Sequence, residues 1–157
     1  MAAIEKFTSQ TNDLAADFII GIGGGKTIDT VKAVAHNLSI PLVIIPTLAS
    51  TDAPTSRMSV IYKEDGSLEN YLFYGKNPDL VMVDSQVVAN APSRFLAAGF
   101  GDALSTWIEA RAIKKAEQST ILQANQTLTS LAIAEKCEEI IFNYSRQACL
   151  LYTSPSP

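Results

Sequence analysis

The chain has 157 residues, 47% of them hydrophobic, and a formal net charge of −4 at pH 7. This size and composition predict a folded domain, or a domain with part of another, and argue against a disordered chain. The acidic balance argues against nucleic acid as a partner, and no apolar run approaches the roughly 18 residues that a membrane span needs.

The chain opens with the pattern of a helix, a strand, a glycine-rich turn and a second helix. Residues 4–14 read as the end of a helix, and the apolar run at 17–22 reads as a buried strand. Three consecutive glycines at 23–25 form the turn. Apolar residues then recur at helical spacing, which predicts a helix over 26–38.

The glycine turn carries the strongest chemical signal. A strand, a glycine turn and a helix together aim backbone N–H groups and a helix N-terminus at a phosphate, and Lys26 adds a cation there. The sequence matches neither standard motif. A P-loop needs glycine at Ile20, and the dinucleotide fingerprint needs one at Lys26 or Ile28. We predict a nucleotide site, with a tight turn that binds no ligand as the alternative.

The next elements predict a parallel sheet followed by a hairpin. Prolines bound a second apolar run at 42–45, which makes a β-α-β unit with the first strand. A polar loop follows at 47–56, and residues 58–62 alternate like a strand. Residues 64–67 read as a hairpin turn, and 80–84 read as another buried strand.

From Pro92 the pattern becomes helical, so we expect a domain boundary near residue 90. Pro92 stands near a helix start, a second helix is predicted at 101–115, and a third at 118–146. The tail at 151–157 is rich in Ser and Pro and breaks the helical pattern. It is expected to be disordered or not native to the protein.

The cytoplasm is the expected location. The sequence begins without a basic region followed by an apolar core, so no secretory signal is visible. The two cysteines, Cys137 and Cys149, fit neither a C-x-x-C motif nor a zinc pattern. We therefore expect both to be reduced thiols.

Two aspartates have alternative roles. Asp52 follows the carboxyl end of the second strand, where parallel sheets bind ligands, and it can accept hydrogen bonds from substrate hydroxyls. It can equally cap a short helix. Asp102 follows two glycines, and on spacing alone we expect it to be a helix N-cap.

The chain resembles the glycerol dehydrogenases of the iron-containing (group III) alcohol dehydrogenase superfamily. The resemblance covers roughly residues 4–145 and rests on four runs in the family's order: GIGGGKTIDTVKA, PTLASTDAP, NPDLVMVD and LAAGFGDALSTWIEARA. It implies an α/β fold, with a partial parallel-sheet NAD-binding domain at 1–90 followed by the start of an all-helical metal-binding domain at 91–150.

The resemblance also implies site residues. The diphosphate of NAD would contact Gly24, Gly25, Lys26, Thr27, Ile28 and Asp29. The ribose region would contact Thr47, Leu48, Ala49 and Ser50. The nicotinamide region would contact Ser56, Met58 and Tyr62. Asp52 matches the residue that binds glycerol. Asp102 matches the first of three zinc ligands, and the other two are histidines. The resemblance therefore favours a zinc ligand over a helix cap for Asp102.

The implied activity is NAD-dependent, zinc-assisted oxidation of glycerol to dihydroxyacetone by a homo-oligomer. The sole histidine, His36, matches no metal ligand, and the two histidine ligands are missing. We therefore expect a middle fragment of the family fold that is inactive alone. The alternatives are a non-catalytic nucleotide-binding fragment, or another polyol or polyol-phosphate dehydrogenase. The last is ranked lower because only Arg57 lies close to Asp52 as a cation.

Overall fold

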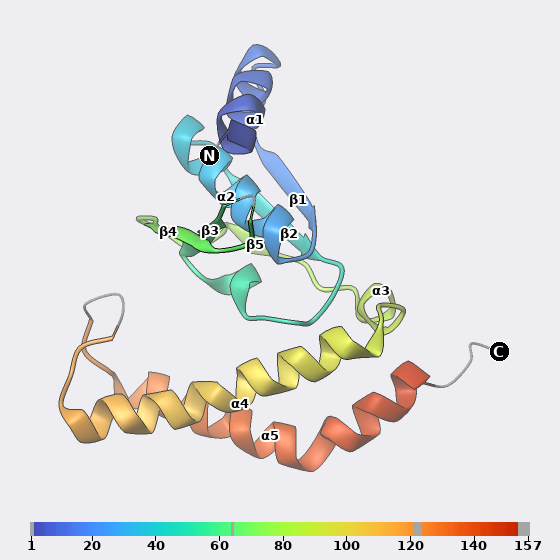
Figure 1. The fold of residues 1–157 in the computed structure, drawn as a ribbon, viewed down its shortest axis with the longest axis vertical. Coiled ribbons are helices and arrows are strands. Elements are labelled where there is room, and N and C mark those ends of the chain that lie inside the picture. The colour runs from blue at the N-terminus through green and yellow to red at the C-terminus, as the bar shows by residue number, and fades with distance from the viewer. Residues whose placement is uncertain (1, 64, 121–123, 154–157) are drawn as a thin grey trace. The chain divides into compact units, whose positions relative to one another are not determined.

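The computed structural model describes residues 2–63, 65–120 and 124–153 (Figure 1). The chain divides into two units, Met1–Asn90 and Ala91–Pro157, called here the N-terminal and C-terminal units. In the described part of the chain, no helix combines the length and the apolar character needed to cross a membrane.

The N-terminal unit begins with the predicted helix and β-α-β motif. Its first four elements are α1 (Ala2–Asp13), β1 (Ile19–Gly23), α2 (Gly25–Leu38) and β2 (Leu42–Pro46). Strands β1 and β2 are parallel, with Ile19 opposite Leu42 and Gly23 opposite Pro46. The prediction of a parallel α/β fold is therefore confirmed.

Helix α2 is buried on two sides and forms the centre of this unit. Its sheet side packs Ile28 and Ala35 against Leu42 and Ile44 of β2. Its other side packs Ala33 and Val34 against Ile4 of α1, Ile61 of β3 (Met58–Tyr62) and Tyr74. Each side removes aliphatic surface from water, so the position of α2 is fixed by both the sheet and the hairpin.

The predicted hairpin is present, while the strand predicted at 80–84 is mostly wrong. Strand β3 pairs antiparallel with β4 (Leu68–Phe73), after the short 3₁₀ helix η1 (Ala53–Thr55). Strand β5 (Leu80–Val81) has only two residues, and it pairs with β2 to give the sheet order β1-β2-β5.

Asp84 explains why β5 is short. Its side chain accepts hydrogen bonds from the N–H groups of Gln86 and Val87 and so begins α3 (Ser85–Ala89). The chain leaves the sheet before this cap, and the side chains of Met82 and Val83 are more than half exposed rather than buried.

The C-terminal unit consists of α4 (Ser93–Ala116) and α5 (Leu128–Thr153), which pack side by side (Figure 1). The separate helix predicted at 101–115 is wrong, because α4 runs through both Gly99 and Gly101. An interior glycine costs a helix about 1 kcal/mol, which a 24-residue helix packed along α5 tolerates.

Helix α5 begins ten residues after the start predicted for the third helix, at 118. The hydroxyl of Thr127 accepts a hydrogen bond from the N–H of Ser130, whose hydroxyl accepts one from the N–H of Thr127. This reciprocal capping sets the start of the helix. The helix continues to Thr153, so the predicted break at 151 is wrong, and residues 154–157 lie outside the described residues.

We expect Gly21→Ala to destabilise the N-terminal unit. A Cβ at Gly21 would lie 2.4 Å from Cγ2 of Val31, at the closest approach of α2 to β1. Overpacking of this kind costs about 1–3 kcal/mol, which urea unfolding measures. The control is Gly101→Ala, where no other heavy atom lies within 4 Å of the new Cβ. Equal stability of the Gly21→Ala chain and the wild type would contradict the close packing of α2 on β1.

Candidate nucleotide-binding site

The glycine turn leaves the N-terminus of α2 open. Gly24 occupies the N-cap position in an extended conformation, and no side chain of the described residues makes a capping hydrogen bond there. The first bond of the helix joins the N–H of Ile28 to the carbonyl of Gly24 at 3.0 Å. The N–H groups of residues 25–27 therefore remain at the end of the helix, where the helix dipole favours an anion.

Gly24 and Gly25 of the turn meet different surroundings. A Cβ at Gly24 would lie 3.3 Å from Cδ2 of Leu48, which is a tight contact with the facing loop. A Cβ at Gly25 would come no closer than 3.9 Å to Thr51, so packing within the protein does not require glycine there. Gly25 lies beside the first N–H groups of the helix, the part of a helix that binds phosphate groups in other proteins.

The loop after β2 lies against this turn. The N–H of Thr47 donates to the carbonyl of Gly23 at 3.1 Å, and Leu48 faces Gly24. Both segments follow the carboxyl ends of neighbouring parallel strands, the edge where such sheets bind ligands. The structure thus brings the predicted residues at 24–27 and 47–50 together.

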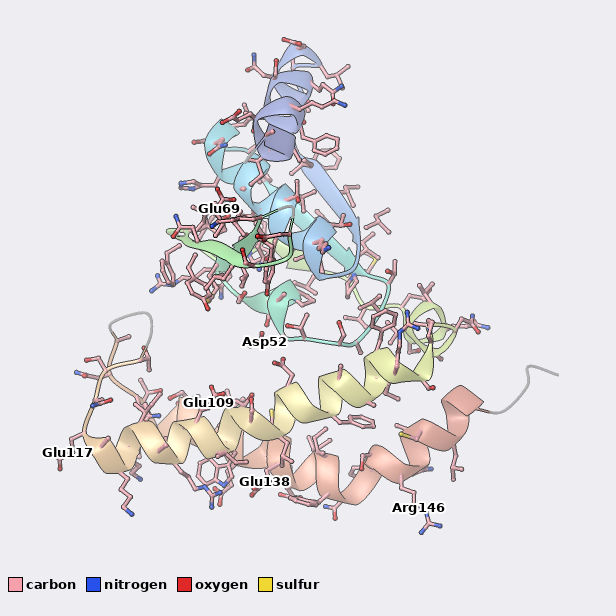
Figure 2. All side chains as sticks on the ribbon, in the orientation of Figure 1. Asp52, Glu69, Glu109, Glu117, Glu138 and Arg146 are labelled. Atoms are coloured by element: carbon pink, nitrogen blue, oxygen red, sulfur yellow. The ribbon has the colours of Figure 1, made fainter. Side chains whose placement is uncertain are left out.

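Asp52 lies in the exposed part of this loop, after β2 (Figure 2). It stands at the N-cap position of η1, but its side chain makes no capping hydrogen bond. Its backbone carbonyl instead accepts hydrogen bonds from the N–H and the hydroxyl of Thr55, both at 3.0 Å. The capping role considered for the Asp52 carboxylate is therefore wrong.

Sequence reasoning did not select Lys32, which is only 2% exposed. Its ammonium donates hydrogen bonds to the carbonyl of Ala53, to Oγ of Ser56 at 3.0 Å and to the carbonyl of Met58 at 2.9 Å. The sequence offered one sign of this burial, because Lys32 lies one helical turn after the core residue Ile28. A lysine on that face needs buried partners, since an unpaired buried charge is costly.

The charges around Lys32 are partly desolvated. Burial lowers the pKa of Lys32, and the carboxylates of Asp29 and Asp52 oppose that shift. Burial also raises the pKa of Asp29, against the opposing effects of Lys32 and of the nearby polar groups of Val60 and Ser59. Lys32 and Asp29 therefore lie in a partly dehydrated environment, where each charge favours the ionised form of the other.

A buried hydroxyl relay continues from α2 into the hairpin. The hydroxyl of Ser59 donates to the backbone carbonyl of Asp29 at 2.9 Å, and the hydroxyl of Tyr74 donates to Ser59 Oγ at 2.9 Å. Burial raises the pKa of Tyr74, and the nearby Asp29 carboxylate adds to that shift. These bonds join α2, β3 and the end of β4.

Several predicted site residues lie away from the turn. Ile28 is fully buried in the core, and Asp29 faces β3 through Val60. Tyr62 ends β3 on the side of the hairpin turn, about 13 Å along the strand from Met58.

Asp102 belongs to the C-terminal unit, in the interior of α4, so the N-cap expected from its spacing is wrong. Its backbone carbonyl accepts hydrogen bonds from the hydroxyls of Ser105 and Thr106. Over residues 2–63, 65–120 and 124–153, no group of three His, Cys, Asp or Glu side chains could hold a metal ion. The residues present therefore do not fit a complete zinc site.

The remaining candidate ligands have ordinary surroundings. His36 is an exposed residue of α2, and its ring lies 5.1 Å from that of Tyr74. Neither Cys137 nor Cys149 forms a disulfide in the described part of the chain.

A cavity of about 240 Å³ lies at the opposite edge of the sheet. Its lining includes His36 and Ser39 near the end of α2, Leu42 at the start of β2, and Asp79 just before β5. These are the amino ends of the parallel strands, whereas ligands of such sheets bind at the carboxyl ends. Among the predicted site residues, only Ser56 reaches it.

Comparison with known proteins adds a family match. The model of the family described as iron-containing alcohol dehydrogenase matches residues 1–85. The chain is 51% identical to the glycerol dehydrogenase of Thermotoga maritima, over 82% of this chain and 35% of that protein. It is 49% identical to the glycerol dehydrogenase of Escherichia coli O6:H1, over 84% and 36%. The chain thus spans about a third of these relatives, in agreement with the prediction that it corresponds to part of the family fold.

Solved structures show the same likeness. A probable glycerol dehydrogenase from Sinorhizobium meliloti 1021 aligns with a TM-score of 0.91 and 41% identity, over 98% of this chain and 44% of that chain. Sulfoacetaldehyde reductase from Bifidobacterium kashiwanohense, solved in complex with NAD+, aligns with a TM-score of 0.74 over 96% of this chain and 43% of that chain. At 18% identity the latter shares the fold alone.

The raised pKa of Asp29 predicts a pH dependence of stability. Between its ordinary pKa of 3.8 and the raised value, the folded chain binds more protons at Asp29 than the unfolded chain does. The contribution of Asp29 to stability therefore falls as pH rises through that window. Asp65 and Asp79 have lowered pKa values and contribute slopes of the opposite sign. The Asp29 slope should therefore appear in the difference in unfolding free energy between the wild type and Asp29→Asn, measured with urea from about pH 3 to about pH 6.

The exposed Asp17 supplies the matched control, because Asp17→Asn removes the same charge from the surface. An Asp29→Asn chain whose unfolding free energy follows the wild-type pH curve would contradict the buried position of Asp29.

Proposed function

Because the chain belongs to the iron-containing alcohol dehydrogenase family, we propose that it is part of an NAD-dependent dehydrogenase that oxidises glycerol to dihydroxyacetone. One observation supports this most directly: the open N-terminus of α2 beside Gly25, with the loop after β2 against it. Identity of 51% and 49% to two glycerol dehydrogenases supports the choice of substrate.

The proposal assigns the diphosphate to the α2 terminus, where residues 24–27 supply N–H groups and Lys26 supplies a positive charge. Residues 47–50 would line the ribose region, and Ser56, Met58 and Tyr62 would line the nicotinamide region. Ile28 and Asp29 belong to the same segment. The buried side chain of Ile28 and the half-buried side chain of Asp29 would support the turn rather than touch the cofactor.

Asp52 would orient the substrate. Its exposed carboxylate can accept hydrogen bonds from two polyol hydroxyls, which fixes the carbon that loses hydride. NAD, when bound, supplies the hydride acceptor, and the protein contributes binding and orientation. The substrate carbon is oxidised to a carbonyl as its hydride leaves and its hydroxyl proton is released.

Zinc enters the proposal only through Asp102, as one ligand of a set that also needs two histidines. A catalytic zinc site ordinarily has three protein ligands, and the described residues offer no such group. No catalytic step is therefore derived through a metal for this chain alone.

The proposal extends to domains and location. Residues 1–90 would form a partial NAD-binding domain, and 91–150 the start of a helical domain. A cytoplasmic homo-oligomer is proposed, with a small polyol as the substrate and neither nucleic acid nor membrane as a partner. The location rests on the expectation that Cys137 and Cys149 are reduced, as in a reducing compartment.

We expect the chain to bind NAD and Gly25→Ala to weaken that binding about tenfold or more, because the new methyl group fills the phosphate space. Folding should be unaffected, since the Cβ meets only an ordinary contact and alanine favours the first turn of α2. Titration calorimetry with NAD and thermal melting measure the two effects separately.

Gly75→Ala is the matched control, because it adds the same methyl group on the lining of the cavity at the other edge of the sheet. Loss of NAD binding in Gly75→Ala, with normal binding in Gly25→Ala, would move the ligand to that cavity and contradict the proposed site.

The substrate is tested on the product of the complete reading frame that contains this sequence. NADH formation with zinc present should be faster with glycerol than with glycerol phosphate, since the loop at 47–56 carries no cation. Asp52→Asn should raise the KM for glycerol about tenfold or more through its lost hydrogen bonds, while Asp17→Asn should not. The 157-residue chain alone should show no turnover.

Preference for glycerol phosphate would refute the substrate proposal in favour of a polyol-phosphate dehydrogenase. NAD binding without turnover by the complete product would favour a non-catalytic nucleotide-binding protein.

A further inference from the structure

We propose that Lys32 is a positioning residue, which holds the segment 52–58 in the shape that receives the nicotinamide end of NAD and the polyol. The inference rests on the proposed function and adds to it a residue that contacts neither ligand. Two observations support it: the contacts of the Lys32 ammonium, and the position of Lys32 on α2.

All three acceptors of the ammonium lie in one short segment. They are the carbonyl of Ala53 in η1, the hydroxyl of Ser56 and the carbonyl of Met58 at the start of β3. An ammonium has three donors, so Lys32 directs its full hydrogen-bonding capacity to this segment. The bonds span both sides of the bend that joins η1 to β3, and they fix the direction in which the chain leaves the loop.

The other hydrogen bonds shown within residues 52–56 are local. The N–H and hydroxyl of Thr55 donate to the carbonyl of Asp52, and the N–H of Ser56 donates to the carbonyl of Ala53 at 3.4 Å. Local bonds set the shape of a turn but do not attach it to the rest of the fold. Lys32 joins this turn to α2, because it is 21 to 26 residues away from its partners in sequence. The N–H of Tyr74 joins the next residue to the hairpin through the carbonyl of Arg57 at 2.8 Å.

A buried lysine at this position costs more folding free energy than an apolar residue would. Burying a charge opposes folding, and apolar residues of similar size often replace buried ion pairs without loss of stability. What an apolar side chain cannot do is fix the direction of two carbonyls and a hydroxyl. The contacts therefore point to geometry rather than to stability as the role of Lys32.

The place of Lys32 on α2 connects the two halves of the site. Lys32 lies seven residues after Gly25, about 10 Å along the same helix. The N-terminus of α2 faces the diphosphate space, and Lys32 holds the segment that carries Asp52, Ser56 and Met58. One rigid helix thus sets the spacing between the two ends of the dinucleotide.

The test compares ADP with NAD in Lys32→Met, which keeps the length of the side chain and removes the ammonium. ADP probes the diphosphate end alone, whereas NAD engages both ends. We expect the affinity for NAD to fall about tenfold and the affinity for ADP to stay within about twofold. A merely structural role would weaken both ligands together. Lys6→Met, which removes an exposed lysine of α1, is the control for lost charge.

A second variant covers the case in which Lys32→Met does not fold. Lys32→Gln keeps a hydrogen-bond donor of shorter reach and removes the charge, so it should show the same selective loss at smaller size. Amide hydrogen exchange of Lys32→Gln should rise at 53–58 and not at 25–28. Equal loss of both ligands, or no loss, in the folded variants would overturn the positioning role while NAD binding by the wild type stood. Failure of the wild type to bind either ligand would instead overturn the proposed function, and this inference with it.

Discussion

The buried ammonium of Lys32 is the interaction on which the candidate site depends. It attaches the loop after β2 to α2, and α2 is itself held by apolar packing against both the sheet and the hairpin. The open helix terminus beside Gly25 belongs to the same element. The site is therefore not a flexible loop placed on a fold but an extension of the most buried helix in the N-terminal unit.

The polar groups around Lys32 favour one arrangement of α2, β3 and the loop, although burying them costs folding free energy. Asp29, Ser59 and Tyr74 form a chain of buried donors and acceptors from α2 into the hairpin. In the described residues, no buried side-chain nitrogen or oxygen lacks a partner. A fully satisfied network of this kind selects one arrangement of α2, β3 and the loop, which apolar packing alone does not do.

The sequence was sufficient for the parallel β-α-β unit and the hairpin, because their apolar periods and turn residues agree. The sequence was misleading where one or two residues determine the start or end of a helix or strand. Two glycines suggested a helix start before Asp102, yet the packed α4 absorbs them. Asp84 and Thr127 set element ends through side-chain hydrogen bonds that no period reveals. Lys32 was missed because a lysine on a helix is ordinarily solvated, and only the folded chain shows what it contacts.

The proposed dinucleotide site lies at the open terminus of α2. Titration of the isotope-labelled chain with NAD, followed residue by residue through backbone amide NMR shifts, tests whether NAD binds there. Binding at this terminus should give saturable shifts at the N–H groups of 24–27 and in the loop at 47–52. Shifts confined to the cavity residues His36, Ser39 and Asn77, or no saturable shift in a folded chain, would contradict it.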